Sequence, residues 1–234
     1  MLILAFETTA KAGSVALLED GKLLAESYQN TGLTHSQTLM VMAEDMLKAA
    51  GKTMSDVTAV AVAEGPGSFT GVRIGVAAAK GLAWGAELPC YGVSTLESMA
   101  LTLGIYEGHV CACMDARRNQ VYNALFYVNS GIMERVCEDR AIALADLKTE
   151  LEHLDGPIFL VGDGSNLTYN TLKEAIPSLI LPPEHRMHQR ASGVALAAAG
   201  KMAAGDPGDA AAMVPNYLRL SQAERERNER MNKQ

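Results

Sequence analysis

The chain has 234 residues, of which 48% are hydrophobic and 20% charged, and its formal net charge is -7. This composition supports a sizeable packed core and excludes wholesale disorder. It also excludes binding of nucleic acid through an overall basic field, so any RNA contact has to be local or supplied by a partner. Because aromatic residues make up only 5% of the chain, alanine, valine, leucine and methionine must fill the core.

The first half of the chain alternates between strand and helix patterns. A nearly continuous apolar run at residues 2–6 predicts a central strand, and Asp20-Gly21 predicts a tight hairpin turn between two further strands. Thr34 or Ser36 is predicted to cap the first helix, and Ser68 and Ser94 the next two. The predicted strands are residues 2–6, 13–18, 22–25, 57–63 and 89–93, and the predicted helices are 36–50, 69–84 and 94–103.

The second half repeats this order less cleanly. The predicted strands are residues 109–114, 120–128, 132–137 and 157–161, and the predicted helices are 144–154, 166–175 and 190–204. Three antiparallel strands, a helix, a parallel strand and a helix, found twice, predict an α/β fold of two tandem ribonuclease-H-like domains, with mixed sheets flanked by helices. We predict domains at residues 1–104 and 105–213, a C-terminal segment at 214–234, and a pocket between the halves.

The class of protein is narrowed further by the two ends of the chain and by its cysteines and histidines. The N-terminal apolar run has no basic region before it and ends at Glu7, and no stretch approaches the roughly 18 apolar residues of a membrane span, so we expect a cytoplasmic protein. The four cysteines form no Cys-x-x-Cys motif, and the histidines do not pair with them at zinc-site spacing. The mixed charges of residues 224–230 predict a solvated or frayed helix, with an arm that touches RNA or a partner as the alternative.

The loop of residues 7–14 is the first candidate for chemistry. It joins two strands and offers hydroxyl groups and a glycine, with which a hairpin can wrap a phosphate through backbone N–H groups. Sugar kinases and actin-like ATPases use such a loop, but the glycine that usually follows the acid is absent here. A small-molecule kinase or ATPase therefore remains an alternative function, with weak nucleotide-binding candidates at Thr8, Thr9, Gly13 and Ser14.

The run Glu64-Gly65-Pro66-Gly67-Ser68-Phe69-Thr70-Gly71-Val72-Arg73 is the second candidate. Its glycines and proline predict a tight turn between a buried strand and a helix, and it lacks the lysine of a phosphate-binding P-loop. One stripe of the helix carries no large side chain, because Gly71, Gly75 and Ala79 recur at every fourth position. Since a helical glycine costs about 1 kcal/mol relative to alanine, the stripe predicts close approach of a helix, from the same domain or from another subunit.

The helix predicted at residues 36–50 is the third candidate. Leu39, Ala43 and Met46 belong to its core face, and Met40 and Met42 widen the apolar surface beyond one stripe. Methionine is common on adaptable binding surfaces, so this helix predicts a protein interface, with simple core packing as the alternative.

Four segments together resemble the TsaB (also YeaZ) family of bacteria, and the likeness covers essentially the whole chain. They are Ile3–Thr9, Glu64–Gly75, Met114-Asp115-Ala116-Arg117-Arg118 and Pro215-Asn216-Tyr217-Leu218-Arg219. The resemblance implies a role in forming threonylcarbamoyladenosine beside the anticodon of tRNAs that read codons starting with A. It implies that a homologous subunit, TsaD, performs the transfer, that the ATPase TsaE joins them, and that tRNA is reached through this complex.

The same resemblance implies that the homologues pack through their N-terminal helices, and that the chain alone forms a homodimer through similar surfaces. The interface residues expected from this are His35, Leu39, Met42, Met46, Gly71, Val72, Gly75, Ala79 and Leu82.

The resemblance also implies that this chain is the catalytically silent partner. Proteins like TsaD carry two metal-binding histidines spaced His-x-x-x-His after the glycine-rich helix, and Thr95 and Met99 stand at those places here. Neither is a competent ligand for a hard or borderline metal ion, so we expect no metal and no catalytic residue. The least favoured alternative is a metalloprotease, and the chain lacks the His-Glu-x-x-His motif of such enzymes. We expect no tightly bound cofactor, and a weak or shared nucleotide at a subunit boundary stays open.

Overall fold

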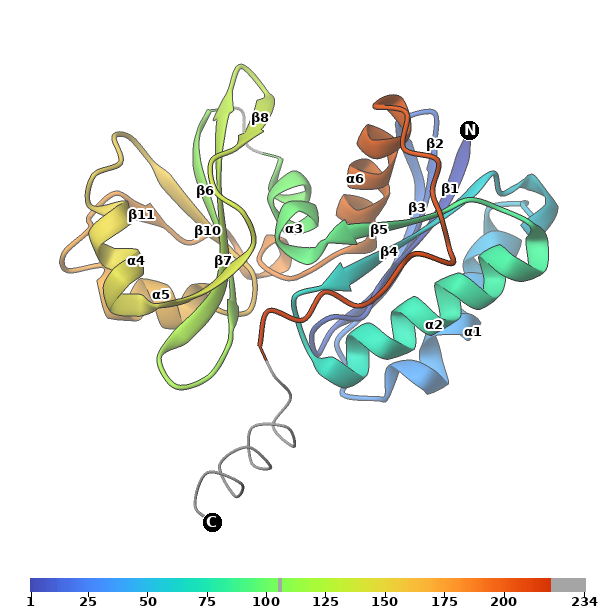
Figure 1. Cartoon of the computed structure of the whole chain (residues 1–234), viewed down its shortest axis with the longest axis horizontal. Coiled ribbons are helices and arrows are strands. Elements are labelled where there is room, and N and C mark those ends of the chain that lie inside the picture. Colours follow the sequence, from blue (N-terminus) through green and yellow to red (C-terminus); the bar gives the residue numbers. More distant parts are fainter. Residues whose placement is uncertain (105–106, 220–234) are drawn as a thin grey trace, which may run out of the picture.

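The computed structural model describes residues 1–104 and 107–219, which form two β-sheets with helices around and between them (Figure 1). The first sheet has five strands in the order β3-β2-β1-β4-β5, in which β2 runs antiparallel to both of its neighbours and β1, β4 and β5 run parallel. Its strands are β1 (Leu2–Glu7), β2 (Gly13–Glu19), β3 (Lys22–Gln29), β4 (Ala59–Gly65) and β5 (Cys90–Ser94).

The central strand β1 is buried on both faces, as its continuous apolar run predicts. Leu4 and Phe6 point to the side covered by α1 (His35–Ala49) and α2 (Phe69–Ala86). Ile3 and Ala5 point to the other side, where α6 (Ala191–Ala203) packs with a run of buried alanines. Small side chains on both partners let α6 lie close to the sheet, which explains how a core so poor in aromatic residues stays filled.

The second sheet has six strands in the order β11-β10-β6-β7-β8, with β9 paired to β7. Helices α4 (Leu144–Leu151) and α5 (Ser165–Leu172) cover its outer face. Its strands are β6 (Gly108–Asp115), β7 (Gln120–Asn129), β8 (Ile132–Arg135), β9 (Arg140–Ala143), β10 (Ile158–Val161) and β11 (Leu179–Ile180).

Helices α3 (Thr95–Leu103) and α6 lie between the two sheets (Figure 1). Leu96 and Met99 of α3 belong to the core of the second sheet. At Gly193 of α6 a β-carbon would collide with the backbone oxygen of Ser98, so the glycine permits this close helix contact. Although α6 lies in the range predicted for the second domain, it packs against the first sheet. The predicted domain boundaries stay a prediction.

Most of the predicted elements are present. The α/β class with mixed sheets flanked by helices is confirmed. Ser68 and Ser94 cap α2 and α3 by accepting from backbone N–H groups, whereas Thr34 precedes α1 without a side-chain cap. The strand predicted at residues 132–137 is wrong in its extent, because it ends at Arg135 and a separate strand, β9, follows. The sequence analysis missed β9 and the short β11. Two short 3₁₀ helices, η1 (Met54–Asp56) and η2 (Glu184–Arg186), complete the described elements.

After α6 the chain returns across the first sheet as an extended segment, residues 204–219 (Figure 1). Met213 is buried among α1, α2 and the sheet, and the Lys80 ammonium donates to its carbonyl oxygen at 2.8 Å. The Asn216 N–H donates to the carbonyl oxygen of Glu64 at 2.7 Å. The charged residues 224–230, predicted to form a solvated or frayed helix, lie outside the described residues. Among the described helices, none has the length and apolar character needed to cross a bilayer.

Candidate functional site

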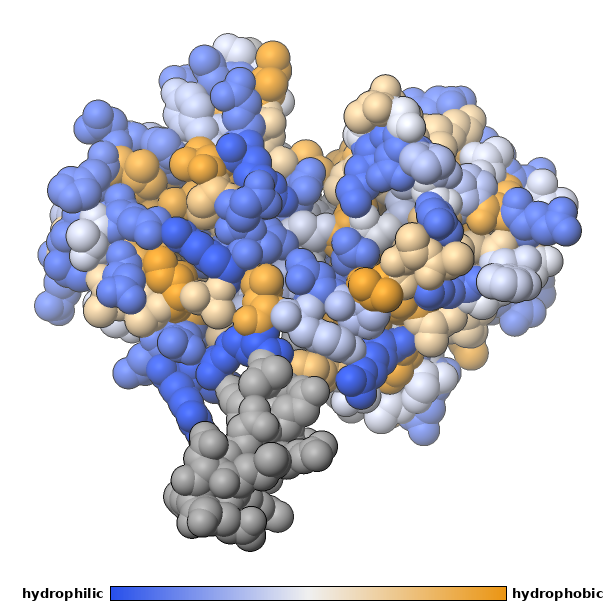
Figure 2. All heavy atoms as spheres, in the orientation of Figure 1, coloured by the Kyte–Doolittle hydropathy of each residue, from blue (hydrophilic) through white to orange (hydrophobic). Residues whose placement is uncertain are grey.

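A cavity of about 530 Å³ lies between the two sheets, where a pocket was predicted. Its walls come from the loop after β1, the start of α2, the end of β6 with the turn that follows, and the C-terminal segment. Figure 2 shows strongly hydrophilic residues on both sides of the point at which the described chain ends. The lining residues are Thr9, Ala10, Lys11, Gly67, Ser68, Phe69, Met114, Asp115, Ala116, Arg117, Tyr122, Asp163 and Arg219.

Glu7 ends β1 behind this cavity and is fully buried. Its Oε1 accepts from the Thr9 N–H at 2.6 Å, and its Oε2 has no hydrogen-bond partner among the described residues. Burial raises the pKa of Glu7 to about 7, the hydrogen bonds from Thr9 oppose this, and the nearby Asp163 carboxylate adds to the rise. Glu7 therefore exchanges a proton near neutral pH.

Asp163 follows β10 and opens onto the cavity, yet protein surrounds its carboxyl closely enough that desolvation raises its pKa. The Gln189 amide donates to its Oδ1 at 3.3 Å, which lowers the pKa, and the Asp115 carboxylate raises it. The Thr9 hydroxyl lies buried on the opposite wall without a described partner. Carboxylate and hydroxyl oxygens from the two halves of the chain therefore gather at this cavity.

The predicted phosphate-loop residues are divided between the fold and the cavity. The Thr8 hydroxyl donates to the Gly71 carbonyl at 2.8 Å, and the Ser14 hydroxyl accepts from the Ala191 N–H at 2.7 Å. A β-carbon on Gly13 would press on the His35 ring. These contacts tie β1 and β2 to three helices, so only Thr9 of the four lines the cavity. Nucleotide binding by this loop stays a prediction.

Most of the predicted interface residues are not at the surface. His35 and Leu82 are half-buried, whereas the other seven are buried within the subunit. A β-carbon on Gly71 would collide with the backbone oxygen of Thr8, and one on Gly75 with the Thr8 hydroxyl. The glycine stripe therefore receives the loop after β1, and the prediction that another helix packs there is wrong for both glycines. The buried set is Leu39, Met42, Met46, Gly71, Val72, Gly75 and Ala79.

The outer faces of α1 and α2 carry a different set of apolar side chains. Met40, Val41 and Trp84 are exposed, and the Trp84 side chain reaches 77% of its full exposure. Met40 lines a groove of about 410 Å³, together with other apolar residues of both helices and the lysines Lys48 and Lys52, whereas Val41 lines a separate groove next to β3. Sequence reasoning missed Val41 and Trp84, because a helical repeat shows which residues share a face but not which face meets solvent.

The two positions at which the resemblance to TsaD-like proteins leads one to expect metal-binding histidines lie in the core. Thr95 and Met99 are fully buried in α3, where Met99 packs with the second sheet. Among residues 1–104 and 107–219, no group of three His, Cys, Asp or Glu side chains is placed to hold a metal ion.

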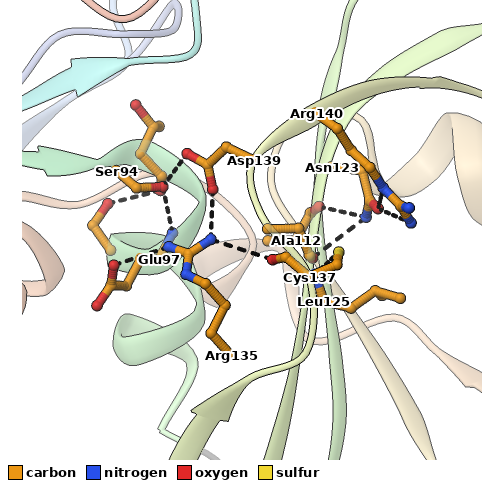
Figure 3. Close-up of polar contacts among 12 residues, drawn as sticks. Ser94, Glu97, Ala112, Asn123, Leu125, Arg135, Cys137, Asp139 and Arg140 are labelled. Carbon is orange, nitrogen blue, oxygen red and sulfur yellow. Dashed lines mark hydrogen bonds and ion pairs between the residues drawn. The ribbon is translucent and has the colours of Figure 1, made fainter. Parts of the chain in front are cut away.

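The exposed side of α3 is occupied by an ion-pair network (Figure 3). Arg135 contacts Glu97 at 2.9 Å and Asp139 at 2.7 Å, and the Ser94 hydroxyl, which caps α3, donates to Asp139. Arg135 also lies over the ring of Phe126 at 4.8 Å. The network fastens the start of α3 to the segment between β8 and β9. Sequence reasoning did not find it, because its partners lie far apart in the chain.

The family model described as "TsaD: tRNA N6-adenosine threonylcarbamoyltransferase" matches residues 28–227 of this chain. The "tRNA threonylcarbamoyladenosine biosynthesis protein TsaB" of Bacillus subtilis is 34% identical over 225 residues, which cover 96% of each chain. The protein of the same name from Escherichia coli is 40% identical over 167 residues, covering 70% of this chain and 72% of its own.

Solved structures give the same relationship. The structure titled "YeaZ from Pseudomonas aeruginosa" superposes with a TM-score of 0.74 at 29% identity and covers 93% of this chain and 99% of its own. The ethanolamine utilization protein EutJ from Carboxydothermus hydrogenoformans shares the fold alone, with a TM-score of 0.53 at 13% identity over 84% of this chain and 90% of its own. These likenesses agree with the predicted α/β class of mixed sheets flanked by helices.

Proposed function

The chain belongs to the TsaB family, and from this premise we propose that it is the accessory subunit that a homologous TsaD-type transferase requires. In this role it supports transfer of a threonylcarbamoyl group to the adenosine beside the anticodon, in tRNAs that read codons starting with A. The ATPase TsaE is the third component, and the cytoplasm, where tRNA is modified, is the expected compartment.

The burial of Thr95 and Met99 supports a silent role more than any other feature. Where a transferase of this fold presents metal ligands, this chain presents a threonine and a methionine packed into α3, and neither binds a hard or borderline metal ion well. The outward side of the same helix is taken up by Ser94 and Glu97, which bind Asp139 and Arg135. The chain's contribution is therefore to shape its partner.

The exposed faces of α1 and α2 are the proposed partner surface. Three large apolar side chains of these helices, Met40, Val41 and Trp84, are exposed, and Met40 lines the groove of about 410 Å³. Exposed large apolar side chains on neighbouring helices, above all a tryptophan, are typical of protein interfaces. We place the TsaD-type partner here, and a second copy of this chain when that partner is missing.

Two variants test this placement. Val41→Glu and Trp84→Ala leave the described core untouched, so both should fold normally and lose capture of the purified TsaD-type partner by at least tenfold. Ile132→Glu is the matched control, because Ile132 is exposed to 68% on the second sheet. The readouts are co-purification and threonylcarbamoylation of unmodified tRNA with the complete set of subunits. Full capture by both variants would contradict the placement.

The silent role has a test of its own. The isolated chain is titrated with ATP and magnesium, and nucleotide turnover is measured. We expect no turnover, whereas magnesium-dependent turnover by the isolated chain would overturn the role of a silent partner and favour the kinase or ATPase alternative.

A further inference from the structure

Five cationic side chains gather at the mouth of the cavity between the sheets. Three of them, Lys11, Arg117 and Arg219, line the cavity, and Arg118 follows Arg117 on the same turn. The Arg73 guanidinium lies 5.8 Å from the centre of the Phe69 ring, which also lines the cavity. The five come from four separate segments of the chain. They stand out because the chain as a whole carries a net charge of -7. We call these five residues the cationic rim.

None of the five takes part in an ion pair within the described part of the chain. Arg219 donates to the carbonyl oxygen of Ala116, and Arg73 donates to the hydroxyl of Tyr217 at 2.8 Å, so both are positioned by neutral groups. Lys11, Arg117 and Arg118 are exposed. Guanidinium groups held in place without carboxylate partners keep their charge available for an outside anion.

The turn between β6 and β7 presents two of these charges in an unusual backbone conformation. Arg117, Arg118 and Asn119 have φ angles of 67°, 56° and 56°, in the left-handed region that non-glycine residues rarely adopt. The turn is fixed at both ends, because the Ala116 N–H donates to the Gln120 carbonyl at 3.0 Å and the Asp115 carboxylate accepts from the Arg117 N–H at 2.7 Å. Its two arginines are therefore held outward on a rigid support.

An aromatic pair lies beside the rim. The rings of Phe69 and Tyr217 stack at 4.3 Å with an angle of 10°, and the Arg73 guanidinium lies 5.5 Å from the centre of the Tyr217 ring. Tyr217 remains 37% exposed. Exposed aromatic rings next to arginines are typical of surfaces that bind single-stranded RNA, on which unpaired bases stack while the cations contact phosphates.

The distribution of acids separates an extended anion from a small one. Asp115 and Asp163 line the cavity, so a phosphate bound inside it would meet carboxylates. Lys11, Arg117 and Arg219 line the cavity as well, but Arg118 and Arg73 extend the positive charge beyond the lining, Arg73 along the C-terminal segment at Tyr217. Charges arranged in this way suit a chain of phosphates that passes along the mouth better than a single phosphate inside.

We propose that the cationic rim and the ring of Tyr217 form a contact surface for RNA, which binds the phosphate backbone of the tRNA loop that the transferase modifies. The proposal rests on the proposed function for the identity of the RNA. It assigns to this subunit a direct part in holding the substrate, in addition to its contact with the partner protein.

The test replaces Arg117 and Arg118 together by asparagine, which tolerates the left-handed conformation and removes both charges. The matched control is Lys22→Asn with Arg186→Asn, two exposed cations elsewhere that change the net charge equally. The probe is a fluorescently labelled anticodon stem-loop RNA, titrated at several salt concentrations against the full chain alone and against its complex with the transferase.

We expect the rim variant to bind the RNA roughly tenfold more weakly. The slope of log K against log salt should fall by about 0.7–0.9 for each lost phosphate contact, and the control should bind like the wild type. Equal RNA affinity and slope for the rim variant and the wild type, both alone at low salt and in the complex, would overturn the proposal. Loss of partner capture by the rim variant with unchanged RNA affinity would overturn it as well, because the rim would then bind protein.

The partner-surface variants keep the two proposals apart. Val41→Glu and Trp84→Ala leave the rim intact, so RNA binding by the isolated chain at low salt should remain at the wild-type level even where capture of the partner is lost. RNA binding by a wild-type chain that fails to capture the transferase would contradict the proposed function and leave the proposal for the rim standing.

Discussion

Glu7 is a residue whose burial moves its titration close to neutral pH. Its carboxyl is fully buried with a pKa of about 7, whereas an unburied glutamate has a pKa of about 4.5. Between these values the folded state binds more protons than the unfolded state, so the free energy of unfolding falls as pH rises from about 5 to above 7. The loss that Glu7 contributes is roughly 3 kcal/mol at most.

The first prediction follows from this titration. In Glu7→Gln the amide oxygen still accepts from the Thr9 N–H, but the side chain no longer ionises. The variant should therefore lack the part of the pH dependence that Glu7 causes, and its stability relative to the wild type should rise between pH 5 and pH 8. Urea unfolding at pH 5, 6, 7 and 8 measures the difference. Parallel stability curves for the two proteins would show that Glu7 does not titrate in this range.

The elements themselves could largely be predicted from local chemistry. The Asp20-Gly21 hairpin and the serine caps of α2 and α3 depend on a few neighbouring residues, and the structure confirms them. Packing partners could not be predicted, because they lie far apart in the chain. The glycine stripe of α2 correctly indicated a close approach, but the approaching group is the loop at Thr8 and not another helix.

The second prediction separates two glycines of α2. Gly75→Ala should destabilise the chain by about 1–3 kcal/mol, because the new methyl group would collide with the Thr8 hydroxyl and press on Val62. Gly81→Ala is the control in the same helix, where a β-carbon meets no atom within 4 Å; it should be neutral or stabilise by up to about 1 kcal/mol. Denaturant unfolding measures both. An equal effect of the two substitutions would mean that propensity alone decides, and that the loop gives way.

The candidate site was predictable in position but not in composition. A cleft between two halves follows from the fold class, and the loop after β1 could be placed at its edge. Its cations could not be assigned from the sequence, because Lys11, Arg117 and Arg219 meet only when both sheets and the C-terminal segment are in place. The tie between Ser94 and Asp139 is of the same kind, since it joins two sheets through side chains 45 positions apart.

At the scale of the whole molecule, the layer of α3 and α6 joins the sheets. Met99 of α3 is fully buried in the core of the second sheet, while Ser98 of the same helix meets Gly193 of α6, which packs on the first. A helix that both cores need couples their stabilities, so the two sheets should unfold together rather than as independent units.

The last prediction tests this coupling. Met99→Ala should cost about 2–5 kcal/mol, since it leaves a cavity beneath the second sheet. Hydrogen exchange followed by mass spectrometry should then show a loss of protection of similar size in β6 and β10 of the second sheet and in β1 and β4 of the first. A matched cavity further from the shared layer, Leu147→Ala on the outer face of the second sheet, gives the comparison, because Leu147 is equally buried but belongs to α4. If unfolding is cooperative, both variants should lower protection in both sheets. If both variants lost protection only in the second sheet, the two sheets would unfold separately. The shared helices would then influence the geometry of the partner surface without coupling the stabilities of the sheets.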